Sequence, residues 1–453
     1  MTERADVVVV GMGPGGEEVA GRLAQAGLDV VGIQQGLVGG ECPYWGCIPS
    51  KMMLRAASLL AEARRIPGMA GEASVYPDWS PVARRIREEA TDDWDDRVAV
   101  ERFEGKGGRF VRGHGRLMGP QVVDVDGRTF EATKAIVLAT GTSPSFPPVP
   151  GLSDVPYWTN HDAVEAKELP TSLVVLGGGA VGLELAQAYA RFGVEVTVVE
   201  ALDRVLPLEE PEASEVVTSV FRREGINVYT AARATKVDRD GEQIRIVLHD
   251  GRAVVGERLL VATGRRADLR TLGVGSIGLD EDAHSVAVDG HLRAAPGVWA
   301  VGDVTGVGAF THIALYQAAI AVADILGQQP GPADYHALPR VTFTDPEVAS
   351  VGLTEVEATR RGLQVRVGST QVPRSAHGWI HKADNDGVIK VVEDADAGVL
   401  VGATSVGPAG GEVLGLLGLA VHARVPTSVL RAMIYAYPTF YRAVEDALAD
   451  LAG

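Results

Sequence analysis

Short runs of apolar, β-branched residues alternate along the chain with stretches of helical periodicity. Residues 6–10 and 172–176 are continuous apolar runs, which are typical of strands buried in a parallel sheet. A helical pattern follows each run and ends at a glycine, Gly27 or Gly193, in the place of a C-cap. The pattern therefore predicts two copies of a strand–helix unit and an α/β fold.

A glycine-rich turn joins strand and helix in both copies. Each turn has the spacing G-x-G-x-x-G: Gly11, Gly13 and Gly16 in the first copy, and Gly177, Gly179 and Gly182 in the second. The first glycine allows the tight turn, the second lets the backbone approach a pyrophosphate, and the third lets the helix pack on the strand. The helix N-terminus offers its N–H groups to phosphates. A single copy could be an ordinary turn, but two copies predict two dinucleotide-binding domains.

The end of the next strand carries the residue expected at the ribose hydroxyls. In the second copy, strand 195–200 ends at Glu200, 18 residues after Gly182. A carboxylate there would repel a 2′-phosphate, so we expect NAD rather than NADP, although a solvent-facing glutamate is the alternative. The same count from Gly16 reaches Gln34, whose amide can bond a ribose without charge assistance.

The two cysteines of the chain lie together between these nucleotide-binding signals. Cys42 and Cys47 are separated by four residues and precede an apolar helical pattern. A thiol at a helix N-terminus faces the positive end of the backbone dipole, which favours the reactive thiolate. Two buried thiols or a chance pair are the structural alternatives. A zinc site is disfavoured because no further cysteine is present to complete it.

Length and charge limit the class of protein. A chain of 453 residues with 46% hydrophobic and 22% charged residues is long enough for about three domains. The net charge of -17 argues against nucleic acid or an anionic membrane surface as partner. We see no signal peptide and no spanning apolar run, and so expect a cytoplasmic protein, where a cysteine pair is more often catalytic than structural.

The stretch G-G-E-C-P-Y-W-G-C-I-P-S-K around the cysteines resembles the redox-active disulfide of the pyridine nucleotide–disulfide oxidoreductases. That family includes dihydrolipoamide dehydrogenase, glutathione reductase and mercuric reductase, and the resemblance covers nearly the whole chain. It implies two Rossmann-like domains, for FAD and for NAD(P), followed by a C-terminal α+β dimerisation domain. The implied boundaries are 1–150 for the FAD domain, completed by about 275–335, 151–274 for the NAD domain, and 336–453 for the dimerisation domain.

The resemblance also implies further cofactor-binding residues. Asp303 follows Gly302 at the end of an apolar run, and the matching family residue bonds the ribityl chain of FAD. A local turn or helix N-cap is the alternative role for this aspartate. The proline-rich run 143–150 is interpreted as the linker between the two units. The remaining residues expected at the cofactors are Pro14, Gly40, Glu41, Thr140, Gly141 and Gly264.

Lys51 and Glu184 are expected to work as a pair. Lys51 lies one helical turn after Cys47, and Glu184 lies just inside the second fingerprint helix. In the family the matching residues form an ion pair beside flavin N5, where a cation stabilises the reduced flavin. Without the resemblance each would be interpreted as a solvated helix charge.

The resemblance implies a relay of electrons. Hydride passes from NADH to FAD, and the flavin reduces the Cys42–Cys47 disulfide. Cys47 would stay beside the isoalloxazine as a thiolate, and Cys42 would be the outer thiol that exchanges with the acceptor.

The C-terminal third is predicted to be α+β. Thr354 and Glu357 form a capping box, strands are expected near 388–392 and 399–406, and residues 411–423 read as an apolar buried or interface helix. In the family this domain pairs two subunits, and each active site borrows residues from its partner. We therefore expect a homodimer.

One departure from the family lies near the C-terminus. Thiol-handling members carry a His directly before Pro-Thr and a Glu five residues after that His, whereas Tyr437 and Arg442 stand here. All ten histidines precede residue 423, so no shifted register supplies one. A tyrosine with its ordinary pKa near ~10 is a poor base at neutral pH, and loss of a positioned base costs roughly 10²–10⁴ in rate. Tyr437 could donate to a leaving thiolate or pack as an interface aromatic.

Three functions follow from this departure. The first is NADH-dependent reduction of a disulfide, or oxidation of a dithiol, with Tyr437 in an altered role. The second is an NAD(P)H reductase of quinones or other small acceptors directly from flavin, with Tyr435 and Tyr437 suited to a flat acceptor. The third is a flavin-bound redox sensor. His377 and His381 have metal-pair spacing, but Gly378 favours a loop that shapes acceptor access, so no metal is expected.

Overall fold

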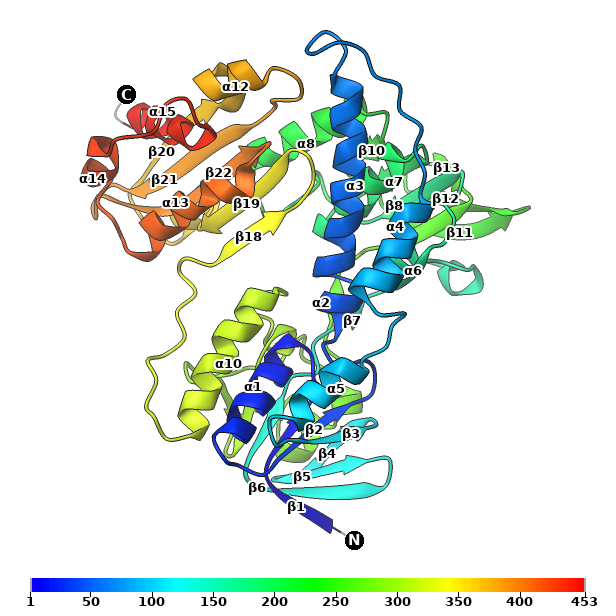
Figure 1. Ribbon diagram of the computed structural model, residues 1–453, viewed down its shortest axis with the longest axis vertical. Coiled ribbons are helices and arrows are strands. Elements are labelled where there is room, and N and C mark those ends of the chain that lie inside the picture. The colour runs from blue at the N-terminus through cyan, green and yellow to red at the C-terminus, as the bar shows by residue number, and fades with distance from the viewer. Residues whose placement is uncertain (1, 452–453) are drawn as a thin grey trace. The chain divides into compact units, whose positions relative to one another are not determined.

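The computed structural model describes residues 2–451, without the side chain of Asp240, and is shown in Figure 1. The described chain divides into two compact units. The first contains the residues up to Pro49, Ala83–Ser145 and Gly264–Asp334, and the second contains Ser50–Val82, Phe146–Thr263 and the residues from Tyr335 onward. The three-domain boundaries expected from the sequence stay a prediction.

The first unit is built on a sheet with the strand order β16-β17-β6-β1-β2-β3. β1 pairs in parallel with both β2 and β6. Its alternate residues enter two different cores: Val7 and Val9 pack with helices α1 and α10, and Val8 and Val10 with residues on the opposite face. Burial on both faces explains the unbroken apolar run in the sequence.

The elements of this unit match the predicted strand and helix. Its strands are β1 (Thr2–Val10), β2 (Val30–Gln34), β3 (Arg109–Arg112), β4 (Gly115–Gly119), β5 (Val122–Val125), β6 (Arg128–Leu138), β7 (Ser143–Pro144), β15 (Arg265–Arg266), β16 (Arg293–Ala295) and β17 (Val298–Ala300). Its helices are α1 (Pro14–Gln25), α2 (Glu41–Tyr44), α5 (Arg97–Glu104), α9 (Leu269–Leu272) and α10 (Thr311–Ile325). Gly27 has the positive φ of 88° expected after a helix end.

The second unit repeats the arrangement in its central segment. A parallel sheet has the order β10-β9-β8-β14, and an antiparallel meander β11-β12-β13 accompanies it. These strands are β8 (Ser172–Leu176), β9 (Glu195–Val199), β10 (Asn227–Tyr229), β11 (Ala234–Asp240), β12 (Gln243–Leu248), β13 (Ala253–Gly256) and β14 (Arg258–Val261). The helices of this segment are α6 (Asn160–Glu165), α7 (Ala180–Arg191) and α8 (Pro211–Arg223). The predicted strand at 172–176 is confirmed.

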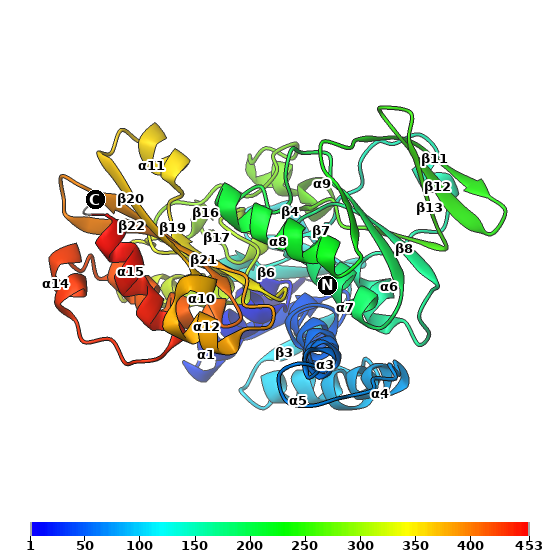
Figure 2. The ribbon, with the colours of Figure 1, turned by 90° about the horizontal axis from the view of Figure 1, so that it is seen from above.

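The C-terminal segment is an antiparallel sheet with the order β18-β19-β22-β21-β20. Helices α13 and α15 pack against this sheet and share one apolar core with it (Figure 2). The elements are β18 (Pro339–Thr342), β19 (Glu347–Gly352), α11 (Glu355–Arg360), β20 (Val365–Gln371), α12 (Ala376–His381), β21 (Val388–Asp394), β22 (Val399–Gly407), α13 (Gly410–His422), α14 (Thr427–Ala432) and α15 (Ala443–Asp450). Both sides of the capping box between Thr354 and Glu357 are present, which confirms that prediction.

Two helices, α3 (Cys47–Arg65) and α4 (Ser80–Arg85), each contain residues of both units. α3 begins at the second cysteine. The loop predicted around Gly378 is wrong, because Ala376–His381 is helical and Ser375 caps it. Gly378 is there for packing, since an added Cβ would lie 1.9 Å from the Val372 carbonyl oxygen. Among residues 2–451, no helix has both the length and the apolar character needed to cross a membrane.

Candidate functional site

The first fingerprint contains glycines with two different purposes. An added Cβ on Gly11 would lie 2.4 Å from the Ala139 carbonyl oxygen, and one on Gly16 would lie 2.0 Å from the Gly11 oxygen. A Cβ on Gly13 would meet no atom of the protein within 4 Å. Gly11 and Gly16 are therefore required by the fold, whereas Gly13 leaves open space at the N-terminus of α1. Pro14 begins that helix, and no side chain caps it, so its N-terminal N–H groups suit a pyrophosphate.

The second fingerprint repeats this division. An added Cβ on Gly177 would lie 2.3 Å from the Ala262 oxygen, and one on Gly182 would lie 2.2 Å from the Gly177 oxygen. Gly179 again has nothing within 4 Å, and neither does Gly264. The residues of both turns thus fit a dinucleotide by the same local geometry, and Gly141 in the first unit is open in the same way as Gly264.

Gln34 and Glu200 occupy equivalent positions. The N–H of Met12 donates to Gln34 Oε1 at 2.7 Å, and the N–H of Gly178 donates to Glu200 Oε2 at 2.6 Å. Each side chain therefore accepts from the second residue of its own fingerprint, as the equal sequence count predicted. Contact with a ribose stays a prediction for both.

The second polar atom of each of these two side chains has a different kind of contact. Gln34 Nε2 donates to the Leu37 carbonyl at 3.2 Å, while Glu200 Oε1 accepts from the Leu202 N–H at 2.7 Å. The Glu200 carboxylate therefore accepts from two N–H groups beside the second fingerprint. The first fingerprint has a neutral amide there.

Asp303 lies at the end of β17 with two partners that the sequence analysis missed. It accepts from Thr142 Oγ1 at 3.3 Å, and Thr142 Oγ1 in turn accepts from Arg265 Nε at 3.0 Å. Burial raises the pKa of Asp303, and the Arg265 charge opposes that rise. Arg265 also pairs with Glu41 at 3.1 Å. Gly302, with φ of 79°, turns the chain into this cluster.

A sequence signal for the two missed residues exists. Each Rossmann unit closes with Ala-Thr-Gly, and Thr142 and Arg265 are the residues that follow those glycines. The residues that follow the two Ala-Thr-Gly segments, Thr142 and Arg265, therefore lie together in the first unit. Thr140 lies at the same closure, where its backbone nitrogen would be 2.7 Å from a Cβ on Gly11.

The cysteines lie at the start of two consecutive helices. Cys42 is in α2, and Cys47 is the first residue of α3. Gly40 has φ of 64°, and its added Cβ would lie 3.1 Å from Gly13 Cα, so the cysteine stretch runs beside the first fingerprint. The Cys47 sulfur lies 3.4 Å from Thr311 Oγ1, at the N-terminus of α10.

The two thiols form a hydrogen-bonded pair. The hydrogen bond with Cys47, and then burial, raise the pKa of Cys42 far above its ordinary range. The two sulfurs therefore interact directly, and the expected thiolate at Cys47 and the roles of the two sulfurs in turnover stay predictions.

Lys51 and Glu184 form the ion pair that the resemblance implied. Lys51 Nζ lies 2.8 Å from Glu184 Oε2 and 4.6 Å from the centre of the Phe343 ring. The other Glu184 oxygen accepts from the Phe343 N–H at 2.9 Å. Glu184 thus binds the lysine and the chain after β18 at the same time. A place beside a flavin stays a prediction for this pair.

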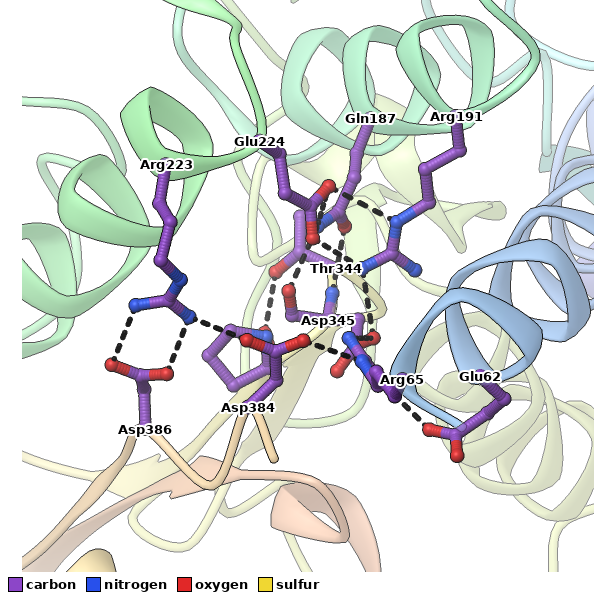
Figure 3. Close-up of polar contacts among 11 residues, drawn as sticks. Glu62, Arg65, Gln187, Arg191, Arg223, Glu224, Thr344, Asp345, Asp384 and Asp386 are labelled. Carbon is purple, nitrogen blue, oxygen red and sulfur yellow. Dashed lines mark hydrogen bonds and ion pairs between the residues drawn. The ribbon is translucent and has the colours of Figure 1, made fainter. Parts of the chain in front are cut away.

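The same face of α7 binds the following residues of that chain (Figure 3). Gln187 Oε1 accepts from the Asp345 N–H at 2.7 Å, and Gln187 Nε2 donates to the Asp345 carbonyl at 2.8 Å. Arg191 and Arg65 donate to the Asp345 carboxylate at 2.8 and 2.7 Å. Burial alone would raise the pKa of Asp345, but the two guanidinium groups outweigh it and hold that pKa below its usual range. Segment 343–345 is therefore rigidly tied to α7.

Tyr437 and Arg442, which replace the family's His and Glu, lie close to each other. Tyr437 is 73% exposed in the single chain, and the Arg442 guanidinium lies 5.9 Å from its ring centre. Arg442 pairs with Glu445 at 3.2 Å and Asp446 at 3.3 Å on α15. The expectation of an aromatic pair for a flat acceptor is wrong for Tyr435. That residue is only 8% exposed, and its hydroxyl donates to the Leu430 carbonyl at 3.1 Å.

Comparison with known families decides the class of protein. The sequence pattern described as pyridine nucleotide-disulphide oxidoreductase matches residues 5–323, and the pattern of that family's dimerisation domain matches residues 338–448. The chain belongs to the pyridine nucleotide-disulphide oxidoreductases. It is thus a flavoprotein oxidoreductase with a redox-active cysteine pair, in a family that binds FAD and NAD(P).

Individual members of this family are similar over almost their whole length. A dihydrolipoyl dehydrogenase from Chlorobaculum tepidum is 35% identical, covering 98% of this chain and 96% of the relative. A mercuric reductase from Streptomyces lividans is 33% identical, covering 97% and 94%. Among solved structures, LpdA from Mycobacterium tuberculosis is 27% identical with a TM-score of 0.85, covering 99% of both chains. The flavoprotein disulfide reductase RclA from Escherichia coli, solved as a Cu(II) complex, is 25% identical with a TM-score of 0.87 over 99% of both chains.

Proposed function

We propose that the protein is an NADH-dependent disulfide reductase in which the Cys42–Cys47 pair exchanges with a disulfide substrate, or with a dithiol in the reverse direction. The observation that supports this most strongly is the close pairing of the two thiols, since a hydrogen bond between them raises the pKa of Cys42. Two adjacent sulfurs are suited to exchange, because one can form a mixed disulfide with the substrate and the other can then attack it and release the product. The name of the dihydrolipoyl dehydrogenase relative supports a substrate of this kind.

The residues of this chain would divide the work as follows. The first fingerprint would hold FAD, which would supply hydride chemistry and two electrons for the cysteine pair. Asp303 and Gly13 would hold that cofactor. Lys51, fixed by Glu184, would place a cation where negative charge develops. Cys47 would hold the thiolate, and Cys42 would form the bond to the substrate sulfur.

The nucleotide is proposed to be NADH, and the assembly a homodimer. Two N–H groups hold the Glu200 carboxylate beside the second fingerprint, which supports NADH over NADPH because a carboxylate there would repel a 2′-phosphate. The match to the dimerisation domain supports a homodimer. The cytoplasmic location expected from the sequence stays a prediction.

A second candidate is an NAD(P)H reductase of quinones or other small acceptors, reduced without thiol exchange. The observation that favours it is Tyr437, because a tyrosine stands directly before Pro438, where thiol-handling members of the family carry the histidine that serves as their base. The name of the mercuric reductase relative shows that family members are not confined to disulfides.

Replacement of Cys42 by serine separates these candidates. Anaerobic oxidation of NADH would be measured with a cyclic disulfide and with a benzoquinone, in the wild type and in the Cys42→Ser variant. The first proposal expects the disulfide activity to vanish in the variant and to dominate in the wild type. Quinone turnover that survives unchanged in the variant, with no disulfide turnover in the wild type, would support the second candidate. Retained disulfide turnover in the variant would contradict the first proposal.

A further inference from the structure

The hydroxyl group of Thr311 lies against the cysteine pair. Thr311 Oγ1 is 3.4 Å from the Cys47 sulfur. A hydrogen bond with Cys47 and burial raise the pKa of Cys42, and a hydrogen bond with Thr311 opposes that rise. One hydroxyl group is therefore within hydrogen-bonding reach of both sulfurs. All three residues belong to the first unit.

Ionisation of a sulfur fixes the direction of this hydrogen bond. Between a neutral thiol and a hydroxyl group either partner can be the donor. A thiolate has no proton to give, so beside a thiolate the Thr311 hydroxyl donates. A hydrogen bond to an ionised group is roughly twice as strong as one between neutral groups. The contact therefore stabilises the reduced pair most when one of its sulfurs is a thiolate.

Thr311 is also the first residue of α10, a helix of 15 residues. The N-terminus of such a helix carries a positive partial charge. The residue at the N-cap is Phe310, whose aromatic side chain offers no oxygen to the first N–H groups of the helix. The helix end and the hydroxyl group of Thr311 therefore act in the same direction on the Cys47 sulfur, because both favour a negative charge there.

The position of α10 is fixed within the first unit. α10 lies beside α1, where an added Cβ on Gly15 would lie 3.2 Å from the Ala314 Cβ (Figure 1). The buried Gln317 accepts from the Gly302 N–H at 2.6 Å and so joins the helix to the end of β17. Both contacts come from the first two turns of α10, which also carry Thr311. The hydroxyl group is therefore held in place by the fold.

We propose that Thr311 activates the reduced Cys42–Cys47 pair by donating its hydroxyl hydrogen to the sulfur that carries the negative charge. This inference rests on the proposed disulfide reductase function. A nucleophile can be activated by a neighbouring general base or by stabilisation of its ionised form. Tyr437 stands where the family carries its histidine base, and this chain uses the second way.

The proposed step balances within the pair. The Cys42 proton moves to the Cys47 sulfur as the Cys42 sulfur attacks one sulfur of the substrate, which forms a mixed disulfide and breaks the substrate S–S bond. The expelled substrate thiolate takes that proton from Cys47. The Cys47 thiolate then attacks the Cys42 sulfur, restores the protein disulfide and releases the second substrate sulfur as a thiolate. Two electrons have moved from the protein dithiol to the substrate, and Thr311 keeps its own proton throughout.

Other titratable or charged groups lie on the elements around the pair. They include Glu17 on α1, Glu41 and Tyr44 on α2, Lys51 on α3 and His312 on α10. Glu41 is paired with Arg265, and Lys51 with Glu184. These groups are the same in the wild type and in the variants below, so a difference between the proteins reports the hydroxyl group.

The first test compares Thr311→Val with Thr311→Ser and Tyr316→Phe in the full-length protein loaded with FAD. Valine has the shape of threonine without the hydroxyl group, and serine keeps that group. Tyr316→Phe is the matched control, because it removes another hydroxyl group of α10, one that accepts from the Asp334 N–H at 2.9 Å. The pair would be reduced with dithiothreitol and freed of it anaerobically. Alkylation of each cysteine by iodoacetamide would then be followed against pH.

Loss of the hydroxyl group should move the alkylation profile. A hydrogen bond to an ionised group changes an equilibrium by about tenfold, so we expect the midpoint of the profile to lie about one pH unit higher in Thr311→Val than in the wild type. Thr311→Ser and Tyr316→Phe should keep the midpoint of the wild type. Equal midpoints in the wild type and Thr311→Val, or an equal rise in Tyr316→Phe, would overturn the inference.

A second measurement follows the redox equilibrium of the pair with reduced and oxidised dithiothreitol. Without the donor the reduced pair is less stable, so at pH 7 the equilibrium constant for its formation should fall about tenfold in Thr311→Val, which lowers the reduction potential by about 30 mV. An unchanged constant would overturn the inference even if turnover of a cyclic disulfide fell, because turnover also responds to structural damage. Absence of disulfide turnover in the wild type, with both shifts present, would refute the proposed function but not the stabilisation of the thiolate by Thr311.

Discussion

Substitution of alanine at two glycines of the first fingerprint should separate cofactor binding from folding. Gly13 has ordinary backbone angles, φ −70° and ψ −176°, and an added Cβ meets no atom within 4 Å. Alanine at position 13 lowers the conformational entropy of the unfolded chain, which stabilises the folded protein by about 0.4–1 kcal/mol. Alanine is also less favourable than glycine at the N-cap of a helix, and this destabilises the folded protein by about the same amount. We therefore expect the free energy of unfolding of Gly13→Ala to lie within about 0.5 kcal/mol of the wild type.

Gly16→Ala is the matched opposite. Its Cβ would lie 2.0 Å from the Gly11 carbonyl oxygen and 3.0 Å from the Ala139 Cβ, so the helix must move away from the strand. Overpacking of this kind costs about 1–3 kcal/mol, and backbone atoms cannot yield as a side chain can. The apoprotein should therefore unfold at a clearly lower urea concentration.

FAD affinity should be reduced specifically by Gly13→Ala, the variant that keeps the stability of the apoprotein. The methyl group of Gly13→Ala occupies the space through which the backbone approaches a pyrophosphate, so we expect the Kd for FAD to rise at least tenfold, or about 1.4 kcal/mol. The assays are urea unfolding of the apoprotein and quenching of flavin fluorescence on reconstitution. If Gly13→Ala binds FAD as the wild type does, or loses as much stability as Gly16→Ala, the division of roles between these glycines is refuted.

Two further predictions concern the second unit. Glu200→Gln should reduce the preference for NADH over NADPH, measured as the ratio of kcat/KM values, by about tenfold, because the charge that repels a 2′-phosphate is removed. Gln34 shows that an amide fits the equivalent position of the first fingerprint. An unchanged ratio of kcat/KM values would contradict this prediction. Asp345→Asn should lose about 2 kcal/mol of stability at pH 7, because Arg65 and Arg191 lose a shared carboxylate. Since the folded state lowers the pKa of Asp345, this contribution exists above about pH 4 and disappears as the pH falls through the folded-state pKa. Urea unfolding should therefore show a smaller difference from the wild type at pH 3 than at pH 7.

The parts of the fold with strong local signals could be predicted from the sequence. The strand 172–176 matches β8, and the predicted helix 411–423 differs from α13 by one residue at each end. Both have an apolar pattern with a glycine at one end, so local sequence and burial agree. The roles of the three glycines in the first fingerprint could be predicted too, because their spacing determines which one faces open space.

Features that depend on contacts distant in sequence could not be predicted. A helix at 376–381 was missed because Gly378 was interpreted as a loop signal, although the glycine serves a contact with the Val372 carbonyl. The burial of Tyr435 was missed because its core neighbours come from other elements of the C-terminal segment. His377 and Pro438 are 61 residues apart, and no pattern in the chain brings the two together.

The attachment of segment 343–345 to α7 has a consequence for protein engineering. Glu184, Gln187 and Arg191 satisfy main-chain and carboxylate groups of that segment from successive turns of one helix. Exchange of the C-terminal domain with that of a relative would leave these side chains facing a foreign loop. A functional chimera should therefore carry the helix and the loop together, and a crossover placed between them should yield a protein that folds poorly.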